Sequence, residues 1–209
     1  MTDLSKQLHM LPKADVHNHL HLSGAFQLLK EHYPGIDFEL PASFYGFDGM
    51  MRFIVQHINA LMQSPEDVTK LMELAIRSAI MDNVTQLEAS VDLDLIKYYD
   101  NSLYEFQKAV RQLKRRYEDQ IDFRPEIGIK KDCPMETVYS NGIACIESEV
   151  FAGVDIYGRE TDADLSDFKT LLETAKAKKK KTKVHIGEFT DHRSVERAIE
   201  ALEPDEIQH

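Results

Sequence analysis

Short apolar stretches alternate with longer segments whose apolar residues recur every three or four positions along most of the chain. The short stretches predict strands, because they are brief and end at turn-forming residues. These predicted strands span 12–20, 84–91, 123–129, 150–157 and 182–186, and a sixth opens at 206–209. The longer segments have helical spacing and predict helices over 25–32, 47–62, 64–82, 103–120, 137–148, 164–179 and 194–201.

Strands that alternate with helices predict a parallel sheet with right-handed crossovers. No Gly-x-Gly-x-x-Gly follows a predicted strand, which argues against a dinucleotide-binding fold. We expect an α/β fold of the (β/α)8 TIM-barrel type, incomplete in this chain, with about six of its eight β/α units. The chain has 209 residues, whereas this barrel typically needs about 250. We therefore expect one barrel domain over 1–209 that is truncated on its C-terminal side, either as a fragment or as a chain completed by another polypeptide.

The composition is that of an ordinary globular protein, with 43% hydrophobic and 29% charged residues. A net charge of −11 argues against nucleic acid or an anionic membrane as the main partner. The basic run Lys178 to Lys181 is interpreted as a solvated helix end, where lysine complements the helix dipole. Cys133 and Cys145 fit no zinc or redox spacing and are expected to be reduced thiols. With no apolar signal core in the first residues and no membrane span, a soluble, cytoplasmic protein is expected.

Two histidines, His17 and His19, stand one residue apart at the end of the first predicted strand. Strand side chains alternate faces, so both imidazoles point the same way and supply half of a transition-metal site. His185, in Val184-His185-Ile186-Gly187-Glu188, could supply a third nitrogen to one zinc ion. Glu188 could then serve as a general acid or base, and the alternative is a helix-capping or surface carboxylate.

The chain resembles the adenosine and AMP deaminases of the metal-dependent amidohydrolase superfamily. Leu11 to Leu20, followed by Ser23-Gly24-Ala25, is similar to the opening motif of that family, and 184–188 is similar to its His-Ala-Gly-Glu motif. Val154 to Glu160 resembles the fourth-strand segment of the family, and Asp205 to His209 resembles the segment that carries its catalytic histidine. The resemblance runs in order along the whole chain.

The resemblance implies roles for individual residues. His17, His19 and His185 would bind Zn²⁺, Glu188 would protonate the purine ring, and His209 would orient or deprotonate the attacking water. The backbone N–H of Gly158 would contact the purine. Four apolar residues match a helix that covers the pocket in this family, and a plain core face is the alternative for that helix: Phe47, Met50, Met51 and Ile54.

The chain departs from the family pattern in two places. His21-Leu22 is inserted after the metal motif, and Ser23 stands where the family has an aspartate that contacts the sugar side of the substrate. The insertion creates a second register, His19-x-His21. We prefer His17 and His19 as ligands, because Pro12-Lys13 then lies at the family's distance, and expect His21 at the rim. The family also places an aspartate ligand on an eighth strand, and the sequence ends before it.

The leading hypothesis is zinc-dependent hydrolytic deamination of an aminopurine nucleoside or base to a hydroxypurine and ammonia. A second hypothesis is another amidohydrolase-type hydrolysis of a C–N bond. Two-metal members of that superfamily use a carboxylated lysine on the fourth strand, and 150–157 contains no lysine. A third is a non-catalytic, truncated barrel with an open edge that needs a partner or further segment. In each barrel model we expect His17, His19, Glu88, His185 and Glu188 near the carboxyl ends of the strands.

Overall fold

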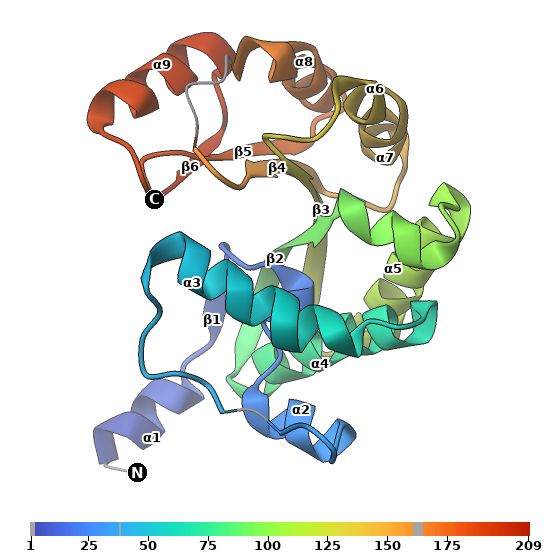
Figure 1. Ribbon diagram of the computed structural model, residues 1–209, viewed down its shortest axis with the longest axis vertical. Coiled ribbons are helices and arrows are strands. Elements are labelled where there is room, and N and C mark those ends of the chain that lie inside the picture. Colours follow the sequence, from blue (N-terminus) through green and yellow to red (C-terminus); the bar gives the residue numbers. More distant parts are fainter. Residues whose placement is uncertain (1–2, 38, 161–164) are drawn as a thin grey trace.

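The computed structural model describes residues 3–37, 39–160 and 165–209, and its centre is one six-stranded parallel sheet. The strands lie in sequence order, so β1 and β6 form the two edges. The sheet curls into part of a barrel with the connecting helices outside (Figure 1). This is an incomplete (β/α)8 barrel, as the sequence predicts. The strands are β1 Lys13–Asp15, β2 Val84–Asp92, β3 Asp122–Lys130, β4 Gly153–Tyr157, β5 Lys181–His185 and β6 Glu206–Gln208.

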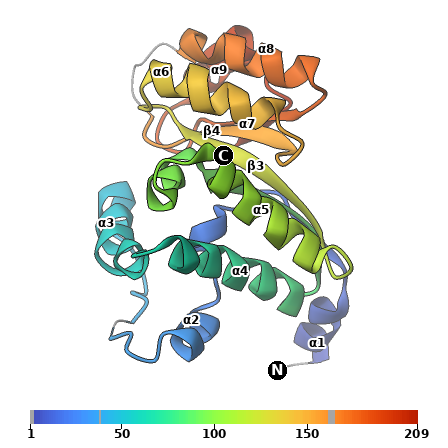
Figure 2. The same ribbon diagram turned by 90° about the vertical axis from the view of Figure 1, so that its right-hand side faces the viewer.

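Helices connect the strands and cover the outer face of the sheet, where the apolar core lies (Figure 2). The α-helices are α1 Asp3–Met10, α2 Phe26–His32, α3 Gly46–Phe53, α4 Pro65–Met81, α5 Leu103–Tyr117, α6 Met135–Thr137, α7 Ile143–Glu147, α8 Lys169–Ala177 and α9 His192–Leu202. Shorter helical turns are η1 Leu20–Leu22, η2 Ile54–Ile58, η3 Asn59–Leu61, η4 Leu93–Tyr99, η5 Val138–Gly142 and η6 Leu165–Phe168. No helix among the described residues has the length and apolar content that crossing a bilayer requires.

Local chemistry explains where these elements begin. Ser64 caps α4 by accepting a hydrogen bond from the Asp67 backbone N–H at 3.1 Å, and Pro65 occupies the first turn. The buried face of α4 then packs on the outside of the sheet. The predicted helix over 47–62 is seen as α3, η2 and η3, which together span 46–61 and lie apart from the outer helices (Figures 1 and 2). The predicted helix over 164–179 is seen as η6 and α8, while residue 164 lies outside the described part of the chain.

The first strand is shorter than predicted. β1 ends at Asp15, and the only later pairing of this segment is a parallel bridge between His19 and Ser90. The Asp15 carboxylate accepts hydrogen bonds from the His17 backbone and from the Asn18 side chain. These local bonds draw the chain out of regular pairing, so both histidines follow the strand instead of lying within it.

Polar side chains fill the concave inner side of the curled sheet. Lys183 illustrates this, since it is 1% exposed and its ammonium contacts three carboxylates. The same ammonium and the Gln208 amide both donate to the carbonyl of Val16, at 2.9 and 3.3 Å. These bonds join β5 and β6 to the segment that follows β1. The interior therefore positions the chain immediately before His17.

Candidate functional site

A cavity of about 570 Å³ opens at the carboxyl ends of the strands. It collects side chains from all six strand ends or the segments after them, together with α3 and η2. Its lining includes His17, His19, His21, Phe47, Met50, Met51, Ile54, Asp92, Lys130, Lys131, Tyr157, Gly158, Arg159, His185, Glu188 and His209. This is the position at which barrels of this type hold their active sites.

Three imidazoles converge in this cavity. His17, His19 and His185 each offer a ring nitrogen, and these atoms lie within 4.8 Å of one another. Three nitrogens bound to one zinc ion at about 2.0–2.1 Å would be roughly 3.4 Å apart in tetrahedral geometry. Small side-chain rotations would bring the three rings to that spacing. Burial and the neighbouring imidazoles lower the pKa of His17 to about 4, so at neutral pH the ring is in the uncharged form that metal binding requires.

A buried carboxylate, Asp155, supports this cluster from β4. Its Oδ2 lies 3.1 Å from Nε2 of His185 and accepts a hydrogen bond from the Ser90 hydroxyl. Its Oδ1 is buried without a hydrogen-bond partner among the described residues. A carboxylate beside a ligand imidazole orients the ring and raises its basicity, and an unpaired carboxylate oxygen adds negative potential that favours a cation. The residues present therefore fit a zinc ion.

Glu188 and His209 form a pair next to the imidazoles. Glu188 Oε2 lies 3.5 Å from His209 Nε2, and both side chains are about one-third exposed to the cavity, at 32% and 30%. The His209 ring makes edge contacts with His17, with centroids 4.7 Å apart. A carboxylate and an imidazole at this distance can each hold or pass a proton to a molecule bound in the cavity.

Glu160 fixes the loop that carries Glu188. Its carboxylate accepts hydrogen bonds from the backbone N–H groups of Gly187, Glu188 and Phe189, and from the Thr190 hydroxyl. Burial alone would raise the pKa of Glu160, but these hydrogen bonds outweigh it and the pKa is lowered. Gly187 has φ +98°, a backbone conformation that glycine adopts without strain. The ionised carboxylate and the glycine together set the direction of Glu188.

A second polar group lies beside His19. Asp92 Oδ1 is 3.8 Å from His19 Nδ1, and Asp92 Oδ2 is 3.9 Å from His21 Nε2. Burial alone would raise the pKa of Asp92, but the two histidines outweigh it and lower the pKa to about 2. The Tyr157 ring packs against His19, with centroids 4.5 Å apart. The cavity thus has an ionised carboxylate on the His19 side and the Glu188–His209 pair beside His17 and His185.

Comparison with known proteins gives one relative of high significance. The "Putative adenosine/adenine deaminase" of Treponema pallidum (strain Nichols) is 33% identical over 198 residues, which are 95% of this chain and 66% of the relative. The chain belongs to the adenosine and AMP deaminase family. It spans about two thirds of the length of that relative. No family model matches the sequence.

Solved structures share the fold of this deaminase-family chain. N6-methyl-AMP deaminase from Arabidopsis thaliana has a TM-score of 0.75 at 20% identity, covering 98% of this chain and 66% of its own. Adenine deaminase from Arthrobacter aurescens has a TM-score of 0.74 at 18% identity, and the match covers 95% of this chain and 64% of its own. An amidohydrolase from Burkholderia ambifaria, solved with bound Zn, has a TM-score of 0.74 at 21% identity, and the match covers 100% of this chain and 62% of its own.

The structure shows where two further residues of the deaminase-family motif lie. The Ser23 hydroxyl donates a hydrogen bond to the His19 carbonyl at 2.8 Å, and a role for Ser23 in binding substrate stays a prediction. His21 is not a rim residue, since it is 6% exposed and lies against Asp92 within the cavity. Both results have one cause. The inserted residues form the turn η1, which directs His21 inward and folds Ser23 back on its own backbone.

A second expectation, that Glu88 lies near a strand end, is also wrong. Glu88 is in the middle of β2, which continues to Asp92, and it binds Lys183 below the cavity. Gly158 does line the cavity, with φ +99°, and its carbonyl accepts a hydrogen bond from Lys131 at 3.3 Å. Phe47 and its three apolar partners on α3 and η2 also line the cavity, which favours a cover over a core helix.

Three residues of the site, Asp92, Asp155 and Tyr157, are not predicted from the sequence. A signal was present, because Glu88, Ser90 and Asp92 alternate with apolar residues along β2. Polar residues at every second position of a strand that is otherwise apolar indicate a polar inner face.

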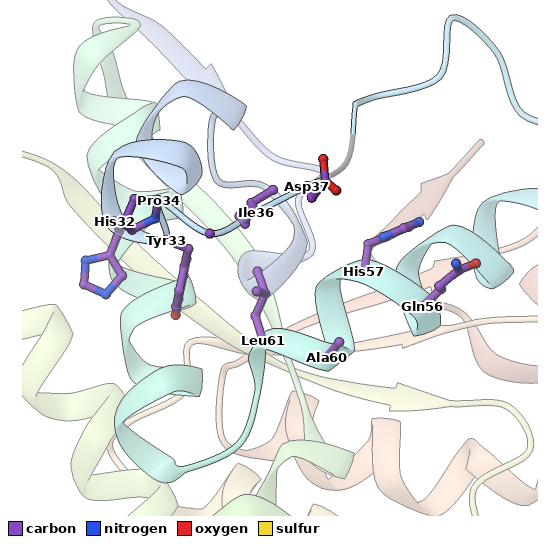
Figure 3. A pocket seen from close by; sticks show the side chains of 10 residues that line it. His32, Tyr33, Pro34, Ile36, Asp37, Gln56, His57, Ala60 and Leu61 are labelled. Carbon is purple, nitrogen blue, oxygen red and sulfur yellow. The ribbon is translucent and has the colours of Figure 1, made fainter.

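A separate hollow of about 490 Å³ lies between the end of α2 and η2–η3 (Figure 3). His32 and His57 both line it, but the figure shows them on opposite sides, with their rings directed apart. Within the described part of the chain, the groups spaced to hold a metal ion are found in the larger cavity instead.

Proposed function

We propose that this protein catalyses the hydrolytic deamination of an aminopurine, releasing ammonia and the corresponding hydroxypurine, with one zinc ion as cofactor. The observation that carries this proposal is the convergence of three imidazoles with the Glu188–His209 pair in one cavity. Family membership and the relative named as an adenosine/adenine deaminase support the choice of substrate class.

His17, His19 and His185 would hold the zinc ion, with Asp155 orienting His185. The metal supplies activation of water, because it lowers the pKa of water toward neutrality. His209 lies against His17 and His185 and would hold the attacking water and take its proton. Glu188 would donate a proton to a ring nitrogen of the purine, so that the ring can accept the attack next to it.

The remaining lining fits a flat, partly apolar ring. Phe47, Met50, Met51 and Ile54 would cover one side of the purine and exclude water from it. The N–H of Gly158 would face the base from β4. Carboxylated-lysine chemistry with two metals is disfavoured, because β4 carries no lysine and Lys183 is already bonded to Glu88 below the cavity.

The test uses Glu188→Gln in the intact polypeptide, with Glu200→Gln on the exposed part of α9 as the matched control. The amide keeps the shape but cannot deliver the proton, so kcat should fall by about 10²- to 10⁴-fold while zinc content stays the same. Ultraviolet absorbance and ammonia release would be followed for adenosine, adenine and related aminopurines. A zinc-loaded, folded protein that releases no ammonia from any of them would refute the proposal.

A further inference from the structure

The peptide group between Val16 and His17 is held from both sides. Its carbonyl accepts hydrogen bonds from the Lys183 ammonium at 2.9 Å and from the Gln208 side-chain amide at 3.3 Å. Its N–H donates to the Asp15 carboxylate at 3.3 Å. Because a peptide group is planar, fixing its two polar atoms also fixes how it is turned about the chain. The direction in which the His17 side chain leaves the backbone is set with it.

The bonds to this carbonyl reach across the open side of the sheet. β1 and β6 are the two edge strands, so backbone pairing does not join them within the described chain. Lys183 lies on β5 and Gln208 on β6, where Gln208 is in register with His185. Both side chains are buried, with 1% of Lys183 and 8% of Gln208 exposed. The last two strands thus hold the segment after the first one, and the His17 and His185 rings meet with centroids 4.7 Å apart.

His19 is held by a different set of contacts. The carbonyl of the preceding residue, Asn18, accepts a hydrogen bond from the Ser90 N–H of β2 at 2.7 Å. The His19 carbonyl accepts hydrogen bonds from the Leu22 N–H at 3.0 Å and from the Ser23 hydroxyl at 2.8 Å. None of these bonds involves β5 or β6, so the two histidines of the motif depend on different parts of the fold.

The Lys183 ammonium can bind the Val16 carbonyl because its charge is balanced locally. Glu88 Oε2 and Glu126 Oε2 lie 2.7 and 3.2 Å from Lys183 Nζ. An ammonium has three N–H donors, so two can go to these carboxyl groups and the third to the carbonyl. A hydrogen bond from a charged donor is stronger than one between neutral groups. Lys183 therefore contributes more than Gln208 to holding Val16.

We infer that Lys183, assisted by Gln208, is a positioning residue for the metal centre, and that it directs His17 without acting on His19. This inference rests on the proposed function only in so far as that function places a zinc ion on the three imidazoles. A ligand that is already oriented binds metal more tightly, because less conformational freedom is lost on binding. Lys183, to which the strand-end motifs give no role, thereby acts on the metal through His17.

The test is isothermal titration of the intact, metal-free polypeptide with Zn²⁺. Lys183→Met removes the bond to Val16, and it is combined with Glu88→Gln so that Glu88 is not left as an unpaired buried charge. Glu88→Gln alone is the matched control, because it disturbs the same interior and retains Lys183. The double variant should bind zinc about 10- to 100-fold more weakly than this control, as expected for the loss of a residue that orients a metal ligand.

Gln208→Leu is a second variant, and it leaves the buried charges in place. It removes a neutral hydrogen bond to Val16 and should weaken zinc binding about 2- to 12-fold. Circular dichroism checks that each variant is folded. Should the Lys183 variant not fold, Gln208→Leu takes its place in the comparisons that follow.

A double-mutant cycle shows whether the effect passes through His17. In a His17→Ala background, removing the Lys183 ammonium should change zinc affinity by no more than about twofold, because the ligand that it positions is gone. In a His19→Ala background, the loss of about 10- to 100-fold should persist. A general loosening of the fold would instead weaken zinc binding in both backgrounds alike.

Equal zinc affinities of the double variant and of Glu88→Gln would overturn the inference, as would equal losses in the His17→Ala and His19→Ala backgrounds. Failure of the wild type to bind zinc would refute the metal centre and this inference together. Ammonia release distinguishes the inference from the proposed function. Zinc binding that depends on Lys183 without ammonia release would retain the positioning role and refute the deaminase. Ammonia release with a zinc affinity that is insensitive to Lys183 would do the reverse.

Discussion

Glu126 should make the protein less stable as the pH rises above about 5. This carboxylate is 3% exposed inside the curled sheet and shares the Lys183 ammonium with Glu88. The ammonium lies 2.7 Å from Glu88 Oε2 and 3.2 Å from Glu126 Oε2. Burial raises the pKa of Glu126 to about 8, with Asp155 and Glu88 adding to the effect and Lys183 opposing it. For Glu88, Lys183 outweighs burial and the pKa is lowered. Glu88 is therefore the ionised partner of Lys183, and Glu126 carries a proton at neutral pH.

The sign of the effect follows from proton linkage. Glu126 has a pKa of 4.5 when unperturbed and about 8 in the fold, so between these values the folded state binds one more proton than the unfolded state. Its contribution to stability is thus complete below pH 4.5 and is lost as the pH rises through 8. At about 1.4 kcal/mol per pH unit, the full loss is of order 5 kcal/mol, an upper bound because Lys183 and Glu88 respond to the ionisation.

Glu126→Gln provides the perturbation, since the amide resembles the protonated acid and cannot ionise. Relative to the wild type, the variant should gain about 1 kcal/mol in unfolding free energy at pH 5.5 and about 2–5 kcal/mol at pH 9. Glu88→Gln is the matched control, and it should lose up to about 3–5 kcal/mol because Lys183 then lacks its nearest carboxylate. Urea unfolding followed by circular dichroism between pH 5.5 and 9 measures both differences.

The informative quantity is the difference in unfolding free energy between the Glu126→Gln variant and the wild type. Histidines titrate in an overlapping pH range, and their effect on stability has the opposite sign. His17 is an example, because its pKa is lowered to about 4 and folding gains from it as the pH rises. If Glu126→Gln and the wild type lost stability in parallel between pH 5.5 and 9, the proton on Glu126 would be refuted.

Three further outcomes concern the candidate site. Glu160→Gln should lower kcat by about tenfold or more while zinc content stays unchanged. The reason is that an amide cannot accept all the backbone N–H hydrogen bonds that hold the Glu188 loop. An unchanged kcat would contradict this prediction. The double variant His17→Ala, His19→Ala should lose about one zinc per protein by elemental analysis, with the fold checked by circular dichroism. Asp155→Asn should weaken zinc affinity by about 10- to 100-fold in a chelator competition assay, and an unchanged affinity would remove its role in orienting His185.

Local signals predicted most of the secondary structure, because they act over a few residues. The cap at Ser64 and the proline after it located the start of α4. The observed helix, Pro65–Met81, differs from the predicted range 64–82 by one residue at each end. The first strand was overextended for a specific reason. Alternating polar and apolar residues over 12–20 resemble a strand, but Asp15 bonds to the backbone and side chains after it and ends the regular pairing. Such a side-chain competitor is not visible in hydrophobic periodicity.

Distant parts of the site differ in how far the sequence predicts them. His17, His19 and His185 could be connected because motifs and strand ends restrict where they lie, and the structure does bring them together. The side of the cavity next to His19 could not be predicted in this way. The direction of His21 depends on the turn η1, and its neighbour Asp92 belongs to a strand far away in the sequence. Only the packing of these two segments places an imidazole and a carboxylate side by side at this edge of the cavity.

The charge cluster and the candidate metal site are parts of one interior. Lys183 and His185 stand two residues apart on β5, so both side chains face inward, one below the other. Lys183 also donates to the carbonyl of Val16, the residue immediately before His17. The ammonium therefore needs a carboxylate partner both to remain buried and to hold the first histidine in place. This explains why a charged residue, instead of an apolar one, occupies the centre of the interior. Replacing Lys183 with an apolar side chain of similar size could preserve the packing, yet it would release the segment that carries His17.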